Sequence, residues 1–135
     1  PRRSRAIPSS QDVIIDPSEV VGLIIGPEEC ARRREKLHGE LSRAVDELKK
    51  MGAERIVLIG SMAEDNTGPW SDIDLLVVMR TRERFLDRLK TAYERIRPSV
   101  AMDILIYTPE ELGEMRQTSA FINYAFERGR VLYAV

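Results

Sequence analysis

The sequence predicts an α/β domain, because three short apolar runs alternate with segments that have helical periodicity. The runs cover residues 55–60, 72–79 and 100–107 and are rich in Val and Ile, which favour strands. The second run is apolar almost throughout, which indicates a strand covered on both faces. With 135 residues, the chain is long enough for one domain with one core.

One long helix is predicted before the first strand and another after the second. Residues 27–51 carry an apolar stripe at helical spacing, and Gly52 ends the segment. The stripe consists of Leu37, Leu41, Ala44, Val45, Leu48 and Met51. Residues 81–97 form the second helix, which Pro98 stops. Its inward side chains are expected to be Phe85, Leu89, Ala92, Tyr93 and Ile96.

The C-terminal part is predicted to hold two more helices and a last strand. Residues 108–111 read Thr-Pro-Glu-Glu, the pattern of a capping box with proline at the first helical position. Residues 119–128 form a further helical piece closed by Gly129, and residues 131–135 are predicted as an edge strand.

Composition and charge restrict the class of protein. Apolar residues make up 43% of the chain and charged residues 32%, which is typical of a globular domain. The net charge of -1 gives no global basic field, so nucleic acid is not an expected partner, although a local basic patch stays open. No apolar run approaches the roughly 20 residues needed to span a bilayer, so a membrane is not expected either. The single cysteine, Cys30, excludes an internal disulfide and favours a reducing, cytoplasmic location. We interpret residues 1–26 as a partly flexible N-terminal extension and residues 27–135 as the domain.

Three aspartates stand in the second and third apolar runs. Asp72 and Asp74 point to the same face of a strand, because side chains alternate along it. Asp103 lies between Met102 and Ile104, where an unpaired charge is costly. Three carboxylates on neighbouring strands repel one another unless a cation neutralises them, and Mg2+ binds through carboxylates and substrate phosphates. The pattern predicts metal-dependent nucleotide chemistry with Asp72, Asp74 and Asp103 as metal ligands and catalytic residues.

The first apolar run ends in Gly60-Ser61. Gly60 lets a ligand approach the backbone closely, and Ser61 begins a predicted helical turn. Free amides and the helix dipole at such a turn form an anion site suited to a triphosphate. A two-metal attack on a phosphoryl centre fits this arrangement. Residues 61–64 also have the pattern of a capping box, so a purely structural role for Ser61 stays open beside phosphate binding.

The order Gly-Ser, then Asp-x-Asp, then an aspartate in the next apolar run resembles the nucleotidyltransferase superfamily related to DNA polymerase β. The match covers about residues 30–107, and the short length resembles the minimal nucleotidyltransferase (MNT) branch. The resemblance implies a small mixed β-sheet flanked by helices, the nucleotidyltransferase fold. It also implies two Mg2+ ions and transfer of a nucleoside monophosphate, expected to be AMP from ATP, to a hydroxyl.

The resemblance also assigns roles to residues. Asp72 and Asp74 would hold both metals, and Asp103 would complete the metal that activates the acceptor hydroxyl. Gly60 and Ser61 would bind the β- and γ-phosphates of the NTP. Stand-alone MNT proteins are often antitoxins paired with HEPN-domain toxins, and some modify a toxin tyrosine with AMP. A HEPN-type toxin is therefore the expected partner protein.

The turn after the first strand departs from the family pattern. Many relatives have Gly-Ser-Arg-Ala-Arg-Gly there, whereas residues 60–65 read Gly-Ser-Met-Ala-Glu-Asp. Met62 replaces a basic residue, and Glu64 and Asp65 add negative charge. The departure favours an alternative function, a non-catalytic partner-binding (antitoxin) module with a degenerate nucleotide site. Small-molecule nucleotidyltransferases of the aminoglycoside-modifying kind, a third option, usually carry an additional helical domain for which this chain has no room.

Other residues permit two interpretations. Trp70 stacks on a base or packs over the sheet edge. Arg128 and Arg130 reach a triphosphate or compensate the dipole at a helix end. His38 is expected to be solvated.

Overall fold

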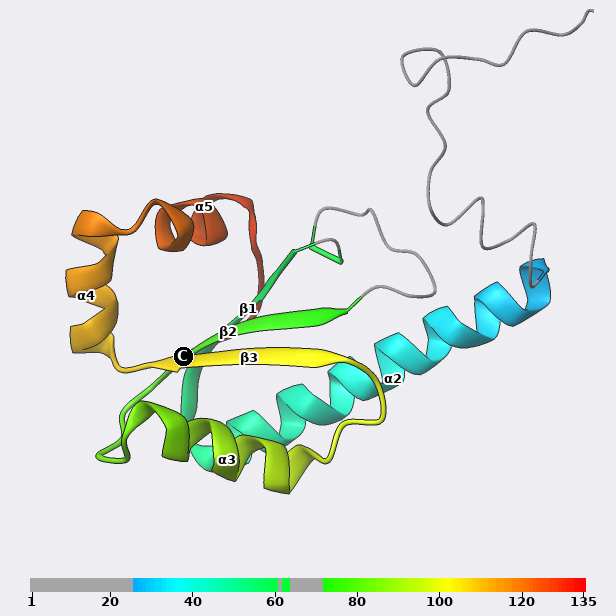
Figure 1. Cartoon of the computed structure of the whole chain (residues 1–135), viewed down its shortest axis with the longest axis horizontal. Helices are drawn as coiled ribbons and strands as arrows, with labels where there is room; N and C mark the ends of the chain where they lie inside the picture. Colours follow the sequence, from blue (N-terminus) through cyan, green and yellow to red (C-terminus); the bar gives the residue numbers. More distant parts are fainter. Residues whose placement is uncertain (1–25, 61, 64–71) are drawn as a thin grey trace, which may run out of the picture.

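The computed structural model describes residues 26–60, 62–63 and 72–135 (Figure 1). These residues form a four-stranded sheet with the order β3-β2-β1-β4. Its strands are β1 (Ala53–Ile59), β2 (Ile73–Met79), β3 (Met102–Tyr107) and β4 (Arg130–Ala134). β3 runs parallel to β2, whereas β1 runs antiparallel to β2 and β4. The expected mixed sheet and the edge position of the last strand are confirmed.

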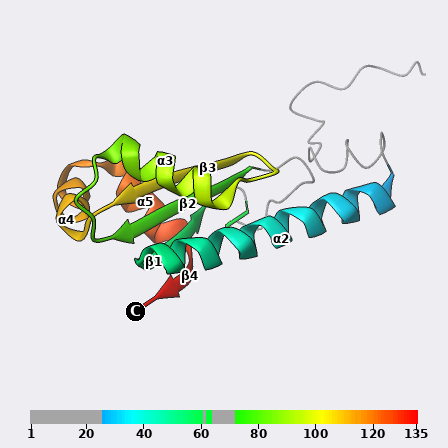
Figure 2. The ribbon, with the colours of Figure 1, turned by 90° about the horizontal axis from the view of Figure 1, so that it is seen from below.

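Two helices, α2 (Pro27–Met51) and α3 (Phe85–Ile96), cover one face of the sheet (Figures 1 and 2). The apolar stripe of α2 packs into one core with side chains of α3 and alternate residues of the strands, as predicted. Gly52 ends α2 as expected, because its left-handed conformation, with φ of 107°, lets its N–H bond the last carbonyls of the helix.

The other helices, α4 (Pro109–Thr118) and α5 (Ala120–Arg128), pack on the opposite face. The second core consists of Val57, Ile59, Leu76, Val78, Leu112, Ile122 and Ala125. β2 supplies alternate residues to both cores, which confirms its burial on two faces. The predicted capping box is also confirmed, since the Thr108 side chain accepts from the Glu111 N–H and the Glu111 carboxylate accepts from the Thr108 N–H.

Some boundaries differ from the predictions. The second predicted helix begins only at Phe85, because the Thr81 hydroxyl accepts a hydrogen bond from the Glu83 N–H at 3.1 Å and holds the preceding residues in a turn. The helix ends at Ile96, where Arg97, directly before a proline, is left-handed with φ of 47°. The strands also shift by one or two residues at their ends, as the bounds above show.

Parts of the chain lie outside the described residues. The predicted N-terminal extension is among them, apart from Gly26. In the part of the chain that the structure describes, no helix is long and apolar enough to cross a membrane. Cys30 is a buried free thiol, and His38 is exposed, as expected.

Candidate active site

The register of the sheet places Asp74 and Asp103 side by side. Asp74 of β2 pairs with Ile59 of β1 on one side and with Asp103 of β3 on the other. Neighbouring strands lie about 4.8 Å apart, and paired residues point to the same face. The structure therefore brings together two of the three predicted carboxylates. Asp103 is exposed, because it lies at the start of β3 and α4 follows the far end of that strand.

Asp72 lies directly before β2 and is exposed. Two residues along an extended chain span about 7 Å, and the register places Asp74, not Asp72, opposite Asp103. Within the described ranges, no group of three or more His, Cys, Asp or Glu side chains is arranged as a complete metal site. The three aspartates thus share one end of the sheet, with Asp74 and Asp103 as the adjacent pair.

The environment of Asp74 disfavours its negative charge. Its partial burial raises the pKa of the carboxyl above its ordinary value, and the nearby Asp103 and Asp72 raise it further. A hydrogen bond between the Asp74 and Asp103 carboxyl groups acts in the same direction. A bound cation would offset the repulsion between these carboxylates.

Gly60 lies against the Asp74 carboxylate. A Cβ atom on Gly60 would stand 2.5 Å from Oδ2 of Asp74, and the backbone here is left-handed with φ of 79°. The left-handed backbone favours glycine, and the absence of a side chain leaves room for the Asp74 carboxylate. The carbonyl of Gly60 accepts a hydrogen bond from the Ala63 N–H at 3.1 Å, which closes a turn next to the carboxylates. Ser61, the second predicted phosphate-binding residue, lies outside the described residues.

We expect the variant Gly60→Ala to lower the free energy of unfolding by about 1–2 kcal/mol, because an L residue is strained at this φ. The new methyl group would also force the Asp74 carboxylate to rotate away. Urea unfolding measures the change. Gly39→Ala is the matched control, since a Cβ there meets nothing within 4 Å and alanine is favoured inside a helix. Equal stability of Gly60→Ala and the wild type would contradict the expectation.

Two contacts hold the turn after Gly60 in place, the burial of Met62 and a hydrogen bond from Arg130. Met62 is only 3% exposed and belongs to the core beneath the sheet, which explains an apolar residue where relatives carry a basic one. Nη2 of Arg130 donates to the carbonyl of Ala63 at 3.4 Å. Glu64, Asp65 and Trp70 lie outside the described residues.

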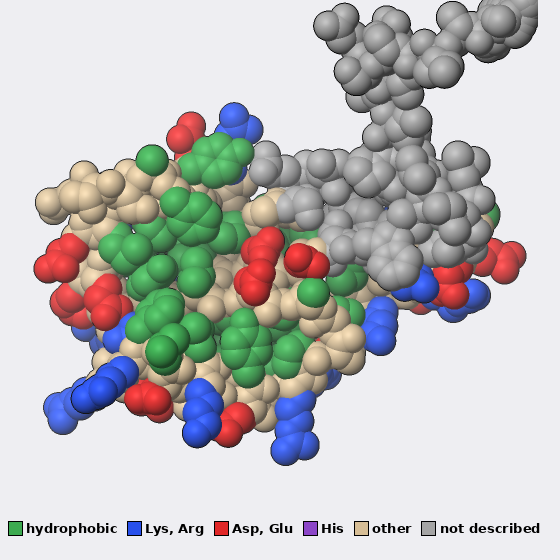
Figure 3. Space-filling model, in the orientation of Figure 1, with side chains coloured by type: hydrophobic (Ala, Val, Ile, Leu, Met, Phe, Trp, Pro, Cys, Tyr) green, Lys and Arg blue, Asp and Glu red, His purple; other side chains and the backbone are tan. Residues whose placement is uncertain are grey.

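A cavity of about 570 Å³ opens beside the two paired aspartates. Asp74 and Asp103 form its acidic side next to Gly60, and most of the remaining lining is apolar or aromatic. The apolar part includes Leu89, Leu105, Phe121 and Tyr124. In the space-filling view a broad hydrophobic patch adjoins a small group of acidic side chains (Figure 3). Arg128 also lines the cavity and lies over the Tyr124 ring, 5.6 Å from its centroid.

A family model of the nucleotidyltransferase domain matches residues 39–132, more than half of the chain. The chain belongs to the nucleotidyltransferase domain family. Membership implies transfer of a nucleoside monophosphate from an NTP. No curated protein and no solved structure matches the chain.

The carboxylates of this nucleotidyltransferase domain fit a divalent metal. The described residues that line the cavity offer oxygen donors and neither histidine nor cysteine, and hard cations such as Mg2+ prefer oxygen. The charges of Asp103 and Asp72 add to the effect of partial burial in raising the pKa of Asp74, so negative charge gathers at the same place. Asp74 and Asp103 are the described side chains that would hold such an ion.

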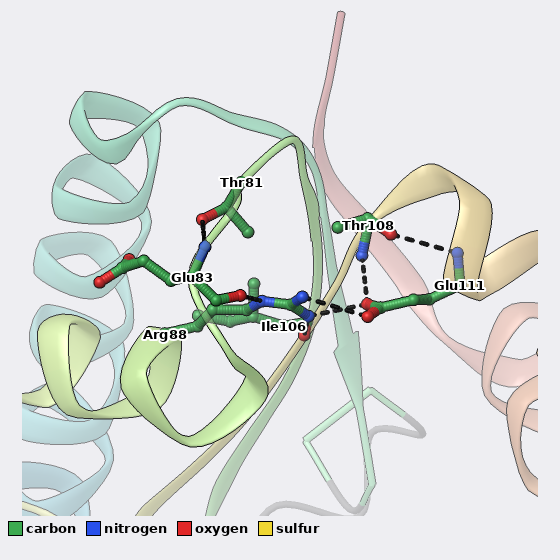
Figure 4. A network of polar contacts seen from close by, with 6 residues as sticks. All are labelled: Thr81, Glu83, Arg88, Ile106, Thr108 and Glu111. Carbon is green, nitrogen blue, oxygen red and sulfur yellow. Dashed lines mark hydrogen bonds and ion pairs between the residues drawn. The ribbon is translucent and has the colours of Figure 1, made fainter.

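The sequence did not reveal the hydrogen bonds by which two side chains of α3, Arg88 and Tyr93, contact β3. Arg88 is only 5% exposed and forms a bidentate ion pair with Glu111, at 2.7 and 3.1 Å (Figure 4). It also donates to the carbonyls of Ile106 and Glu83. Tyr93 packs against the core, as predicted, and its hydroxyl in addition contacts the backbone of β3. No local pattern reveals these partners, because each lies on another element.

Proposed function

We propose that this nucleotidyltransferase domain transfers a nucleoside monophosphate from a Mg2+-bound NTP, AMP from ATP in the first instance, to a hydroxyl group. One observation supports the proposal. Asp74 and Asp103 are paired on neighbouring strands at the edge of the cavity, and Asp74 lies against the backbone of Gly60. This arrangement offers two features that NTP chemistry requires: carboxylates that can bind cations, and a backbone that phosphates can approach closely.

The aspartates would divide the metal ligation between them. Asp72 and Asp74 would hold two Mg2+ ions, and Asp103 would complete the coordination of the ion nearer to the acceptor. When bound, such ions neutralise phosphate charge and make an acceptor hydroxyl more acidic. Asp103, which is exposed on the open end of the sheet, would face the incoming acceptor.

The triphosphate would lie on the turn after β1, where the backbone of Gly60 and the hydroxyl and amide of Ser61 would bind the β- and γ-phosphates. Met62 brings no positive charge to this turn. Arg128 lines the cavity and Arg130 contacts the turn through Ala63, so these two guanidinium groups would offset the phosphate charge instead.

In the reaction, the acceptor oxygen forms a bond to the α-phosphorus and loses its proton to solvent. The bond between the α-phosphorus and the bridging oxygen breaks, and pyrophosphate leaves with the electron pair. The resemblance to the MNT branch makes a protein hydroxyl the proposed acceptor, on a HEPN-type toxin for which this chain would be the antitoxin.

A thermal unfolding experiment tests the nucleotide site without knowledge of the acceptor. Each of the four NTPs is added at millimolar concentration with Mg2+ or with EDTA. A ligand at 100 times its dissociation constant stabilises by about 2.7 kcal/mol, which is several degrees for a domain of this size. We expect a shift that requires Mg2+, that is lost in Asp74→Asn and that is kept in Asp46→Asn, where the aspartate is exposed on α2. No Mg2+-dependent shift with any NTP would overturn the proposal.

The described surface also favours a second candidate function, a partner-binding module with little turnover. Phe121 is 55% exposed and Tyr124 is 50% exposed, and both line the same cavity, so they form an exposed apolar surface that a partner could cover. A complex with the product of a neighbouring gene that forms equally well in EDTA and in Asp74→Asn would support this function over catalysis.

A further inference from the structure

The hydroxyl of Tyr93 is bonded to the free edge of β3. It donates to the carbonyl of Met102 at 2.9 Å and accepts from the N–H of Ile104 at 3.1 Å. β3 is an edge strand, since the sheet order begins with it. Tyr93 is half-buried on α3, which packs against β3.

These two bonds enclose Asp103. The Met102 carbonyl belongs to the peptide group before its Cα, and the Ile104 N–H belongs to the peptide group after it. In a parallel sheet, one residue of a neighbouring strand makes this same pair of bonds, one donated and one accepted. A single phenol oxygen therefore replaces the missing strand at this position. On its other edge, β3 is paired with β2, where Asp74 lies opposite Asp103.

A hydrogen bond to each adjoining peptide group restricts both backbone torsions of Asp103. These torsions set the direction of its Cα–Cβ bond and hence the region that the carboxylate reaches. We propose that Tyr93 is a positioning residue that holds the Asp103 carboxylate beside Asp74, toward the metal and the acceptor. This inference rests on the proposed function of the aspartates.

A simpler explanation for the same contacts is that the Tyr93 hydroxyl only provides hydrogen-bond partners for unpaired backbone groups at the edge of β3. Arg88 shows that kind of role, because it donates to the Ile106 carbonyl farther along the same edge (Figure 4). The two explanations differ in what they predict for metal binding. A residue that only protects the edge affects stability, whereas a positioning residue also affects the affinity of the ligand that it orients.

The test compares Tyr93→Phe, which removes only the hydroxyl, with Tyr107→Phe as the matched control. Tyr107 lies on β3 itself, and its ring stacks on Phe85 away from the aspartates. Mn2+ alone is titrated into each protein and into Asp74→Asn, with the EPR signal of the free ion as readout. Thermal unfolding sets a temperature at which all variants are folded. Groups that orient metal ligands typically change metal affinity by 10- to 100-fold when removed.

We expect Tyr93→Phe to bind Mn2+ about 10-fold more weakly, with Tyr107→Phe equal to the wild type. In turnover, kcat should fall while the KM for ATP stays unchanged, since the phosphate-binding turn is untouched. If Tyr93→Phe lowers the melting temperature but leaves Mn2+ affinity and kcat at wild-type values, the positioning role is wrong and the aspartate site stands. If the wild type shows no Mn2+ binding that Asp74→Asn removes, the proposed function fails and the inference fails with it.

Discussion

The variant Asp74→Asn is expected to lose Mg2+-dependent pyrophosphate release from NTP by about 10³-fold. Metal ions contribute several kcal/mol to transition-state charge stabilisation, and each 1.4 kcal/mol corresponds to a tenfold change in rate. Asn keeps the shape of the side chain but removes the charge that holds the ions. Pyrophosphate release is measured with the four NTPs and the protein product of a neighbouring gene as acceptor. Activity that survives in Asp74→Asn would exclude a metal-binding role for this residue.

The same substitution should raise the stability of the metal-free protein. Burial and the nearby Asp103 and Asp72 raise the pKa of Asp74 above its ordinary value, so the folded state binds its proton more tightly than the unfolded state does. At pH 7 the ionised carboxylate therefore opposes folding, and wild-type stability should rise as the pH falls toward the raised pKa. Asp74→Asn removes this charge permanently.

Thermal unfolding in EDTA at pH 7 measures the effect. We expect Asp74→Asn to melt at a higher temperature than the wild type, and Asp46→Asn, the control, to melt at the same temperature. Gain of stability with loss of activity is the pattern expected at a functional site. A lower melting temperature for Asp74→Asn would instead indicate a structural role for the carboxylate.

The sequence alone predicts those features of the fold and of the site that depend on residues close together in the chain. Gly52 and the Thr108 capping box mark helix ends through their own backbone bonds, so the elements around them were predicted to within a few residues. Asp74 and Asp103 could be found because a charge inside an apolar strand is conspicuous. The pairing of β2 with β3 places Asp74 opposite Asp103, and because side chains alternate along each strand, both aspartates lie on the same face of the sheet.

The tertiary contacts of Arg88, Tyr93 and Met62 could not be predicted, because their partners are distant in sequence. Arg88 stands in a charged helix and looks solvated, yet it is buried against Glu111, and the two are connected only through the fold. Tyr93 fits an apolar stripe, and its hydroxyl partners belong to the backbone of β3. In the sequence, Met62 stands in place of a basic residue that could bind phosphate. Its burial in the core depends on tertiary packing, which the sequence does not reveal.

The variant Arg88→Met is expected to lower the free energy of unfolding by about 3 kcal/mol, on the order of 10 °C in melting temperature. Arg88 is buried and connects three elements, because it pairs with Glu111 of α4 and donates to the Ile106 carbonyl of β3. Methionine fills a similar volume but leaves these partners without a donor. The cost lies at the low end for a broken buried pair, since the Glu111 side chain is 42% exposed.

Urea and thermal unfolding measure this loss, with Arg82→Met as the matched control, because Arg82 is exposed just before the same helix. The double variant Arg88→Met/Glu111→Gln should be more stable than Arg88→Met alone. Gln removes the unpaired charge and still accepts the Thr108 N–H in the capping box. If the double variant were no more stable, the loss would come from packing rather than from the ion pair.

Acid titration separates the ion pair from the packing in a second way. Hydrogen bonds from Arg88 and then from the Thr108 N–H lower the pKa of Glu111 from 4.5 to about 2. A depressed carboxyl pKa contributes stability that is complete above about pH 4.5 and is lost as the pH falls toward 2. Wild-type stability should therefore decline through this window, and Arg88→Met should decline less, because its Glu111 has lost the main cause of the shift. Glu40, whose pKa is also about 2, titrates identically in both proteins and cancels in the comparison. Parallel acid curves for the two proteins would show that Arg88 stabilises the domain through its burial and its carbonyl bonds alone.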